Sequence, residues 1–133
     1  MKHIFFLLTL ILASSSFASN YSPTQPQDSI SLLGNWQMDS TYFFNGDERN
    51  GAGAVGKNVW VFKADGVLEV HMEGIPPFLG TYTLEGTLLE VMLFGSKDPY
   101  QIVRLTEDKL DILLDPSSKK MKSENVFRRV DKP

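Results

Sequence analysis

The stretch Leu32-Leu33-Gly34-Asn35-Trp36-Gln37-Met38 divides the chain into two unlike parts. Before it the sequence is apolar and then rich in Ser, Pro and Gln, and after it come short apolar runs separated by turns. From Trp36 onward, Trp36, Met38 and Ser40 alternate with polar residues. This period of two predicts a β-strand with one solvent-exposed face. The folded domain is therefore expected to begin at Leu32.

The first 18 residues have the three parts of a secretory signal peptide. Met1-Lys2-His3 is basic, Ile4 to Leu12 is an apolar run, and Ser14 to Ala18 supplies small residues. The apolar run is about nine residues long, whereas a helix that spans a bilayer needs roughly 20, so no permanent membrane insertion is expected. We predict cleavage after Ala18, a flexible linker over residues 19–31, and one domain over residues 32–131.

Composition limits the compartment and the partners. With 133 residues, 42% of them apolar, the chain has room for one domain with a modest core. It has no cysteine, which excludes disulfides and a lipid-modified cysteine after the signal. Removing Lys2 with the signal takes the formal charge from -3 to -4, and no basic stripe for nucleic acid remains. We expect an exported monomer, periplasmic or extracellular and not lipid-anchored.

Seven further strands are expected after the first, at 58–63, 67–72, 80–84, 87–94, 100–105, 110–114 and 124–130. A three-residue turn at 64–66 pairs Lys63 with Val67 and keeps the apolar residues of both strands on one face. A two-residue turn at 65–66 would place Trp60 and Phe62 beside Glu69 and His71, so burial favours the longer turn.

The next two hairpins follow the same reasoning. A two-residue turn at 85–86 puts Tyr82 and Leu84 on the face of Leu89. A four-residue loop at 106–109 puts Val103 and Leu105 with Leu110.

The connections alternate in length along the chain. Tight turns at 64–66, 85–86 and 106–109 alternate with longer loops at 45–57, 73–79, 95–99 and 115–123. The first of these, 45–57, is expected to be a loop because it is too rich in glycine for a stable strand. In a meander, alternate connections lie at opposite ends, and closure removes the unpaired edges. We therefore predict an all-β, eight-stranded antiparallel up-and-down barrel with one closed and one open end.

The sequence also resembles a known family. Leu33-Gly34-Asn35-Trp36 is similar to the Gly-x-Trp opening of the lipocalins. The hairpins at 61–66, 80–89 and 105–110 resemble those of small bacterial lipocalin-like domains, and the resemblance covers about 32 to 131. It implies that Gly34 and Trp36 lie at the closed floor, with an arginine of the last strand across the Trp36 ring. We prefer Arg129, which shares its face with Phe127. Solvation of both Arg128 and Arg129 is the alternative.

The resemblance implies a binding protein for a small apolar or amphipathic molecule at the open end. Eight strands enclose an interior that side chains can fill or that holds one small ligand. The candidate ligand contacts are Phe44, Trp60, Phe62, Phe78 and Tyr82. The alternative is a protein-interaction or inhibitor module that uses the same loop end, with a filled barrel, no ligand and a protein partner in the envelope.

Catalysis and metal binding have weak signals. No Ser lies in a nucleophile-elbow context. The carboxylates of Asp39, Asp47, Glu48 and Asp98 could meet at the open end, although acidic loops of any protein would look the same. Glu69, His71 and Glu73 alternate on one strand, on the face expected to be wet. We predict no enzyme, no catalytic residue, no metal and no cofactor.

Overall fold

The structure, a computed structural model, describes residues 30–53, 56–114 and 121–133. The predicted signal peptide, residues 19–29 of the predicted linker and most of the predicted loop at 115–123 lie outside the described residues.

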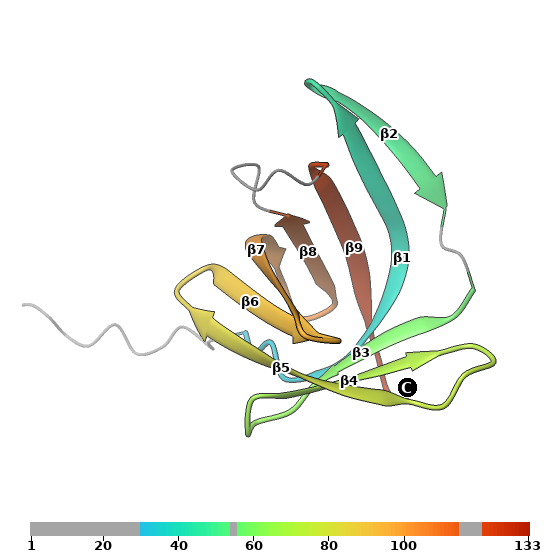
Figure 1. The fold of residues 1–133 in the computed structure, drawn as a ribbon, viewed down its shortest axis with the longest axis vertical. Helices are drawn as coiled ribbons and strands as arrows, with labels where there is room; N and C mark the ends of the chain where they lie inside the picture. Colours follow the sequence, from blue (N-terminus) through green and yellow to red (C-terminus); the bar gives the residue numbers. More distant parts are fainter. Residues whose placement is uncertain (1–29, 54–55, 115–120) are drawn as a thin grey trace, which may run out of the picture.

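Within the described residues, nine strands form one antiparallel sheet (Figure 1). They are β1 (Gly34–Asn45), β2 (Glu48–Gly53), β3 (Asn58–Phe62), β4 (Val67–Met72), β5 (Phe78–Glu85), β6 (Leu88–Leu93), β7 (Ser96–Leu105), β8 (Lys109–Leu114) and β9 (Ser123–Val130). β1 pairs with both β3 and β9, so eight strands close into a barrel and β2 is an addition. The predicted all-β, eight-stranded antiparallel barrel is confirmed. The described residues contain no helix, and hence none that could cross a membrane.

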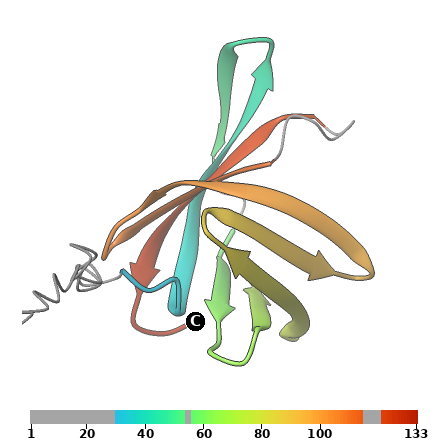
Figure 2. The same ribbon diagram turned by 90° about the vertical axis from the view of Figure 1, so that its left-hand side faces the viewer.

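The prediction of a loop over 45–57 is wrong for residues 48–53. β2 pairs with the outer half of β1, from Asn45↔Glu48 to Ser40↔Gly53, and the hairpin projects beyond the barrel (Figure 2). The Tyr42 ring covers the flat surface of Gly51, its pairing partner, where a Cβ would lie 3.2 Å from the ring. The Arg49 guanidinium lies 3.6 Å from the centroid of the same ring. Cross-strand packing on an aromatic side chain thus offsets the low strand propensity of Gly51.

Two of the three predicted hairpins keep the expected faces. Phe62 pairs with Leu68 and Lys63 N–H donates to the Val67 carbonyl, as the three-residue turn at 64–66 requires. The predicted turn at 85–86 is wrong by one residue, because Glu85 pairs with Leu88 and the turn is Gly86-Thr87. Gly86 has φ +59°, which suits glycine at the first central position of a type II′ turn. The register moves by two residues, so Tyr82 and Leu84 still share the face of Leu89.

Two other local predictions are wrong. Residues 96–99 belong to β7, and the connection from β6 is the two-residue turn Phe94-Gly95. In β7, a bulge between Ile102 and Arg104 turns Val103 outward, where it is 52% exposed, so it does not join Leu105. Ile102 packs on the core in its place. An extra residue in one strand reverses the faces beyond it.

Side chains fill the middle of the barrel. The buried apolar cluster consists of Leu32, Trp36, Trp60, Phe62, Leu68, Val70, Leu89, Val91, Leu110, Ile112 and Phe127. Every strand of the closed barrel contributes to this cluster or packs against it. The core thus fixes the positions of both barrel ends.

Candidate functional site

One end of the barrel, called the floor below, consists of residues 30–33 and the turns 63–66, 86–87 and 106–108. Trp36 is fully buried there, and its Nε1 donates a 2.8 Å hydrogen bond to the Leu32 carbonyl. The Arg129 guanidinium carbon lies 4.1 Å from the Trp36 ring centroid, so the predicted contact is present. Arg128 instead forms an exposed ion pair with Asp39, at 3.2 Å.

Arg129 also fastens two separate segments of the floor to the last strand. Its Nη1 and Nη2 each donate a 2.8 Å hydrogen bond, to the carbonyls of Leu33 and Ser31 respectively, and its Nε donates to the Glu107 carbonyl. Gly34 makes room for it: φ is +125°, and a Cβ would lie 2.6 Å from Arg129 Nη1. Ser31, the last residue of the predicted linker, is therefore held against the barrel.

The structure separates the five candidate ligand contacts. Trp60 and Phe62 are buried in the core, where the Trp60 ring centroid lies 5.3 Å from that of Phe127. Tyr82 is half-buried beside Phe62, with centroids 5.0 Å apart. Phe44 lies on the β1–β2 hairpin under Lys122, whose Nζ is 4.5 Å from its ring centroid. The core position of Trp60 and Phe62 gives these rings a packing role.

The opposite end, called the rim below, includes the turns 73–77 and 94–95. Phe94 is 83% exposed and has φ +52°, and its ring centroid lies 4.6 Å from that of Phe78. These two rings are called the aromatic tip. Gly80 lets β5 lie close to β6 beside this tip, because a Cβ at that position would collide with Leu93 and with the Met92 carbonyl. Sequence reasoning missed Phe94, although Gly95 after an apolar run was an available turn signal.

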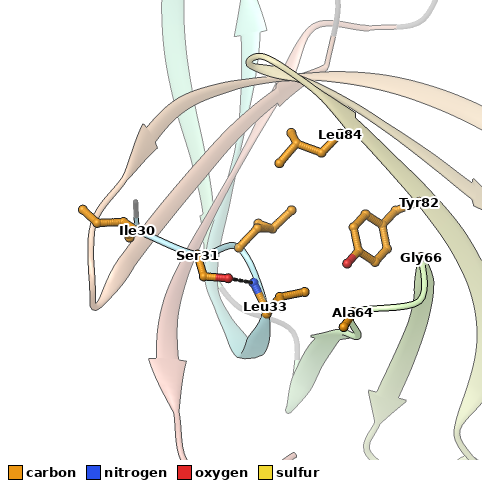
Figure 3. Close-up of a pocket in the computed structure, with 8 residues that line it drawn as sticks. Ile30, Ser31, Leu33, Ala64, Gly66, Tyr82 and Leu84 are labelled. Carbon is orange, nitrogen blue, oxygen red and sulfur yellow. Dashed lines mark hydrogen bonds between the residues drawn. The ribbon is translucent and has the colours of Figure 1, made fainter. Parts of the chain in front are cut away.

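A pocket of about 430 Å³ opens at the floor (Figure 3). Its lining consists of Ile30, Ser31, Leu32, Leu33, Ala64, Gly66, Tyr82 and Leu84. One wall is the segment that precedes β1, and the other is the β3–β4 turn together with the end of β5. Sequence reasoning missed this pocket because its two walls are far apart in the sequence.

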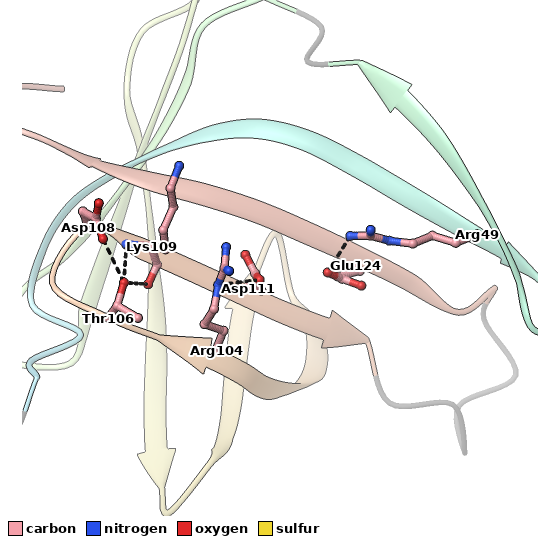
Figure 4. Close-up of polar contacts among 7 residues, drawn as sticks. All are labelled: Arg49, Arg104, Thr106, Asp108, Lys109, Asp111 and Glu124. Atoms are coloured by element: carbon pink, nitrogen blue, oxygen red, sulfur yellow. Dashed lines mark hydrogen bonds and ion pairs between the residues drawn. The ribbon is translucent and has the colours of Figure 1, made fainter.

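A row of charged residues crosses the outer face of β7, β8, β9 and β2 (Figure 4). Arg104 pairs with Asp111 at 3.0 Å, and Arg49 pairs with Glu124 at 2.9 Å. Asp111 is 9% exposed, and within the described chain its Oδ1 accepts no hydrogen bond. Burial raises the pKa of Asp111, while the Arg104 charge opposes that increase. The row joins neighbouring strands through these ion pairs.

The strand carboxylates and His71 form ordinary pairs. Glu69 accepts from Lys63 Nζ at 2.7 Å and lies 2.5 Å from His71 Nε2, and hydrogen bonding to Lys63 lowers the pKa of Glu69. Glu73 accepts from the Lys57 backbone N–H. In residues 30–53, 56–114 and 121–133, no three His, Cys, Asp or Glu side chains gather closely enough to hold a metal ion.

No protein-family model matches this chain, and no curated protein is significantly similar to it. The barrel, its aromatic tip and its floor pocket are therefore the basis for the function proposed below.

Proposed function

We propose that this protein is an exported, non-enzymatic binding module of lipocalin-like type, and that its rim docks on a protein partner in the envelope. The residues at positions 1–18 support export. The convex shape of the aromatic tip and the unfavourable backbone conformation of Phe94 support docking.

The single observation that carries the proposal is Phe94. A bulky residue at φ +52° costs roughly 1–2 kcal/mol relative to a residue that tolerates the left-handed region. The ring contact with Phe78 stabilises the fold by about 0.5–1.5 kcal/mol. This gain is about as large as the backbone cost, so phenylalanine at this position adds little to the stability of the fold. Strained, exposed aromatic residues that the fold does not need are candidates for binding.

The shape of the tip favours a protein over a small molecule. A ring that is 83% exposed at the end of a two-residue turn is convex. A convex ring cannot enclose a small ligand. A pocket on a partner protein can enclose the ring, as happens with aromatic anchors at protein interfaces. The filled barrel around Trp60 and Phe62 agrees with this reading.

A second candidate is the small apolar or amphipathic ligand that the resemblance implies. One observation favours it: Met38, Phe78, Leu93 and Tyr100 are only partly buried against the core. Such a ligand would contact these residues in place of Trp60 and Phe62.

The test is affinity purification from the native envelope with three proteins: wild type, Phe94→Asn and Met92→Asn. Met92 is a matched control because it is an exposed apolar residue two positions away, on the outer face of β6. We expect a stoichiometric protein partner with wild type and Met92→Asn, and its loss with Phe94→Asn.

Two results would overturn the proposal. One is a co-purifying small molecule, detected by native mass spectrometry, with no protein partner. The other is Phe94-dependent binding to phosphatidylethanolamine and phosphatidylglycerol vesicles with no protein partner, which would assign the tip to a membrane surface.

A further inference from the structure

We propose that the floor pocket is a preformed binding site for a small, uncharged, apolar molecule. This site lies at the opposite end of the barrel from the aromatic tip and does not depend on the function proposed for the rim.

The first wall of the pocket is rigid. Residues 31–33 lie outside the strands, yet each of their three carbonyls accepts a 2.8 Å hydrogen bond, two from Arg129 and one from Trp36. Ser31 Oγ also accepts from the Leu33 N–H at 3.1 Å. Because both donor side chains belong to the barrel, this segment keeps its position without a ligand. Because the segment is already ordered, ligand binding would cost little conformational entropy of the protein, which favours affinity.

The second wall is equally fixed. Tyr82 N–H donates to the Gly66 carbonyl at 2.9 Å, and the Tyr82 hydroxyl donates to the Lys63 carbonyl. Gly66 is at φ +79°, in the tight turn that only glycine adopts without strain. The β3–β4 turn and β5 are thus joined, and the gap between the two walls cannot close by a simple movement of the turn.

The chemistry of the lining defines the ligand class. Its eight residues include no charged side chain, although 22% of the chain is charged. The Ser31 and Tyr82 hydroxyls and the carbonyls of residues 31–33 already have hydrogen-bond partners within the walls. Ile30, Leu33 and Leu84 remain exposed, and Leu84 is 44% exposed. These eight lining residues therefore offer apolar contact and no charged group to balance a ligand charge.

The size of the pocket suits a small molecule. Ligand sites in proteins measure about 300–1,000 Å³, and this pocket measures about 430 Å³. Burial around the Tyr82 ring raises the pKa of its hydroxyl, with a smaller contribution from the Asp65 carboxylate, which is consistent with a poorly hydrated wall.

The test uses the purified protein with all residues that follow the predicted cleavage site. N-phenyl-1-naphthylamine, an uncharged apolar fluorophore, is titrated while its emission is recorded. We expect saturable binding of one molecule per chain and a dissociation constant in the micromolar range. Chemical-shift changes in the backbone amides of Leu33, Ala64 and Gly66 should locate the fluorophore at the floor.

Two variants and a control connect binding to the pocket. Leu84→Glu places a carboxylate in the pocket, and Ala64→Phe fills it without adding charge. Each should reduce the affinity at least tenfold. Leu79→Glu is the matched control, because Leu79 lies on the same strand, is 67% exposed and does not line the pocket; its affinity should stay within twofold of wild type. Far-ultraviolet circular dichroism checks that each variant is folded.

Four results would overturn the inference. Three of them are the absence of saturable binding by wild type, equal binding by wild type and a folded Ala64→Phe, and binding that appears only when the residues before Ile30 are removed. The last result would show that the chain itself fills the pocket. Loss of binding in Phe94→Asn with no effect of Leu84→Glu would place the fluorophore at the rim and would likewise contradict the floor site.

Discussion

Arg129 lies over the Trp36 ring at 4.1 Å and donates hydrogen bonds to the carbonyls of Ser31, Leu33 and Glu107. One side chain thereby joins the last strand to the segment before the first strand and to the β7–β8 turn. This connection closes the floor of the barrel and holds one wall of the floor pocket.

Arg129→Ala should lower the free energy of unfolding by about 2–4 kcal/mol, because it removes a cation–aromatic contact and hydrogen bonds from a charged group. Arg129→Lys keeps the charge but loses the planar fork, so an intermediate loss is expected. Urea unfolding followed by tryptophan fluorescence measures both. The control is Arg128→Ala, which removes an exposed ion pair and should cost less than about 1 kcal/mol. Equal losses at positions 128 and 129 would contradict the role of Arg129.

Phe94→Asn should change the free energy of unfolding by less than about 1 kcal/mol, because relief of backbone strain offsets the lost contact with Phe78. Asparagine suits the first position of a turn in which both central residues have positive φ, as Phe94 and Gly95 do. Thermal and urea unfolding of the purified variant provide the measurement. A loss of 2 kcal/mol or more would show that Phe94 serves the fold.

Gly80→Ala should destabilise the barrel by about 1–3 kcal/mol, because the added methyl group meets the Met92 carbonyl and the Leu93 side chain. Gly53→Ala is the control: a Cβ at position 53 has open space around it within 4 Å. Its free energy of unfolding should remain within about 0.5 kcal/mol of wild type. A Gly80→Ala variant as stable as Gly53→Ala would mean that β5 and β6 separate at no cost.

The Tyr100 hydroxyl should ionise at an unusually high pH. Burial raises its pKa to about 12, with a smaller contribution from the Asp98 carboxylate. Because the folded pKa lies above the unfolded value of 10, the folded state retains the proton longer, and stability falls as pH rises from 10 to 12. The loss should reach about 2–3 kcal/mol.

Absorbance at 295 nm follows the titration of Tyr100, and urea unfolding at pH 9 to 12 follows the loss of stability. Tyr100→Phe should lose both the titration step at high pH and the loss of stability that accompanies it. Tyr82→Phe should keep both. A Tyr100→Phe protein with the same alkaline dependence as wild type would assign the effect to other groups.

Much of the architecture could be predicted because it depends on local patterns. The alternation around Trp36, the Gly66 turn and the apolar faces of β3 and β4 each require only a few consecutive residues. The choice of Arg129 over Arg128 followed from strand alternation with Phe127, since neighbours on a strand point to opposite faces.

The local predictions were wrong where the conformation of a segment depends on its contacts with a neighbouring strand or on an unusual backbone conformation. β2 was missed because Gly51 packs under Tyr42, which supplies the contact that a glycine side chain lacks. The bulge at Val103 was missed because an unpaired residue appears only when the β7–β8 register is known. The turn at 94–95 was missed because Phe94 adopts a backbone conformation that its residue type disfavours.

By itself the sequence determined the class of fold, the order of the barrel strands and most of the inward faces, because hydrophobic periodicity and turn glycines act over short distances. Only the tertiary structure decided the positions of the aromatic tip and the floor pocket. The aromatic tip needs Phe78 of β5 and Phe94 of the β6–β7 turn, and the floor pocket needs residues 30–33 beside residues 64–66 and Tyr82. These positions are set by closure of the barrel, which brings together segments that no local pattern relates.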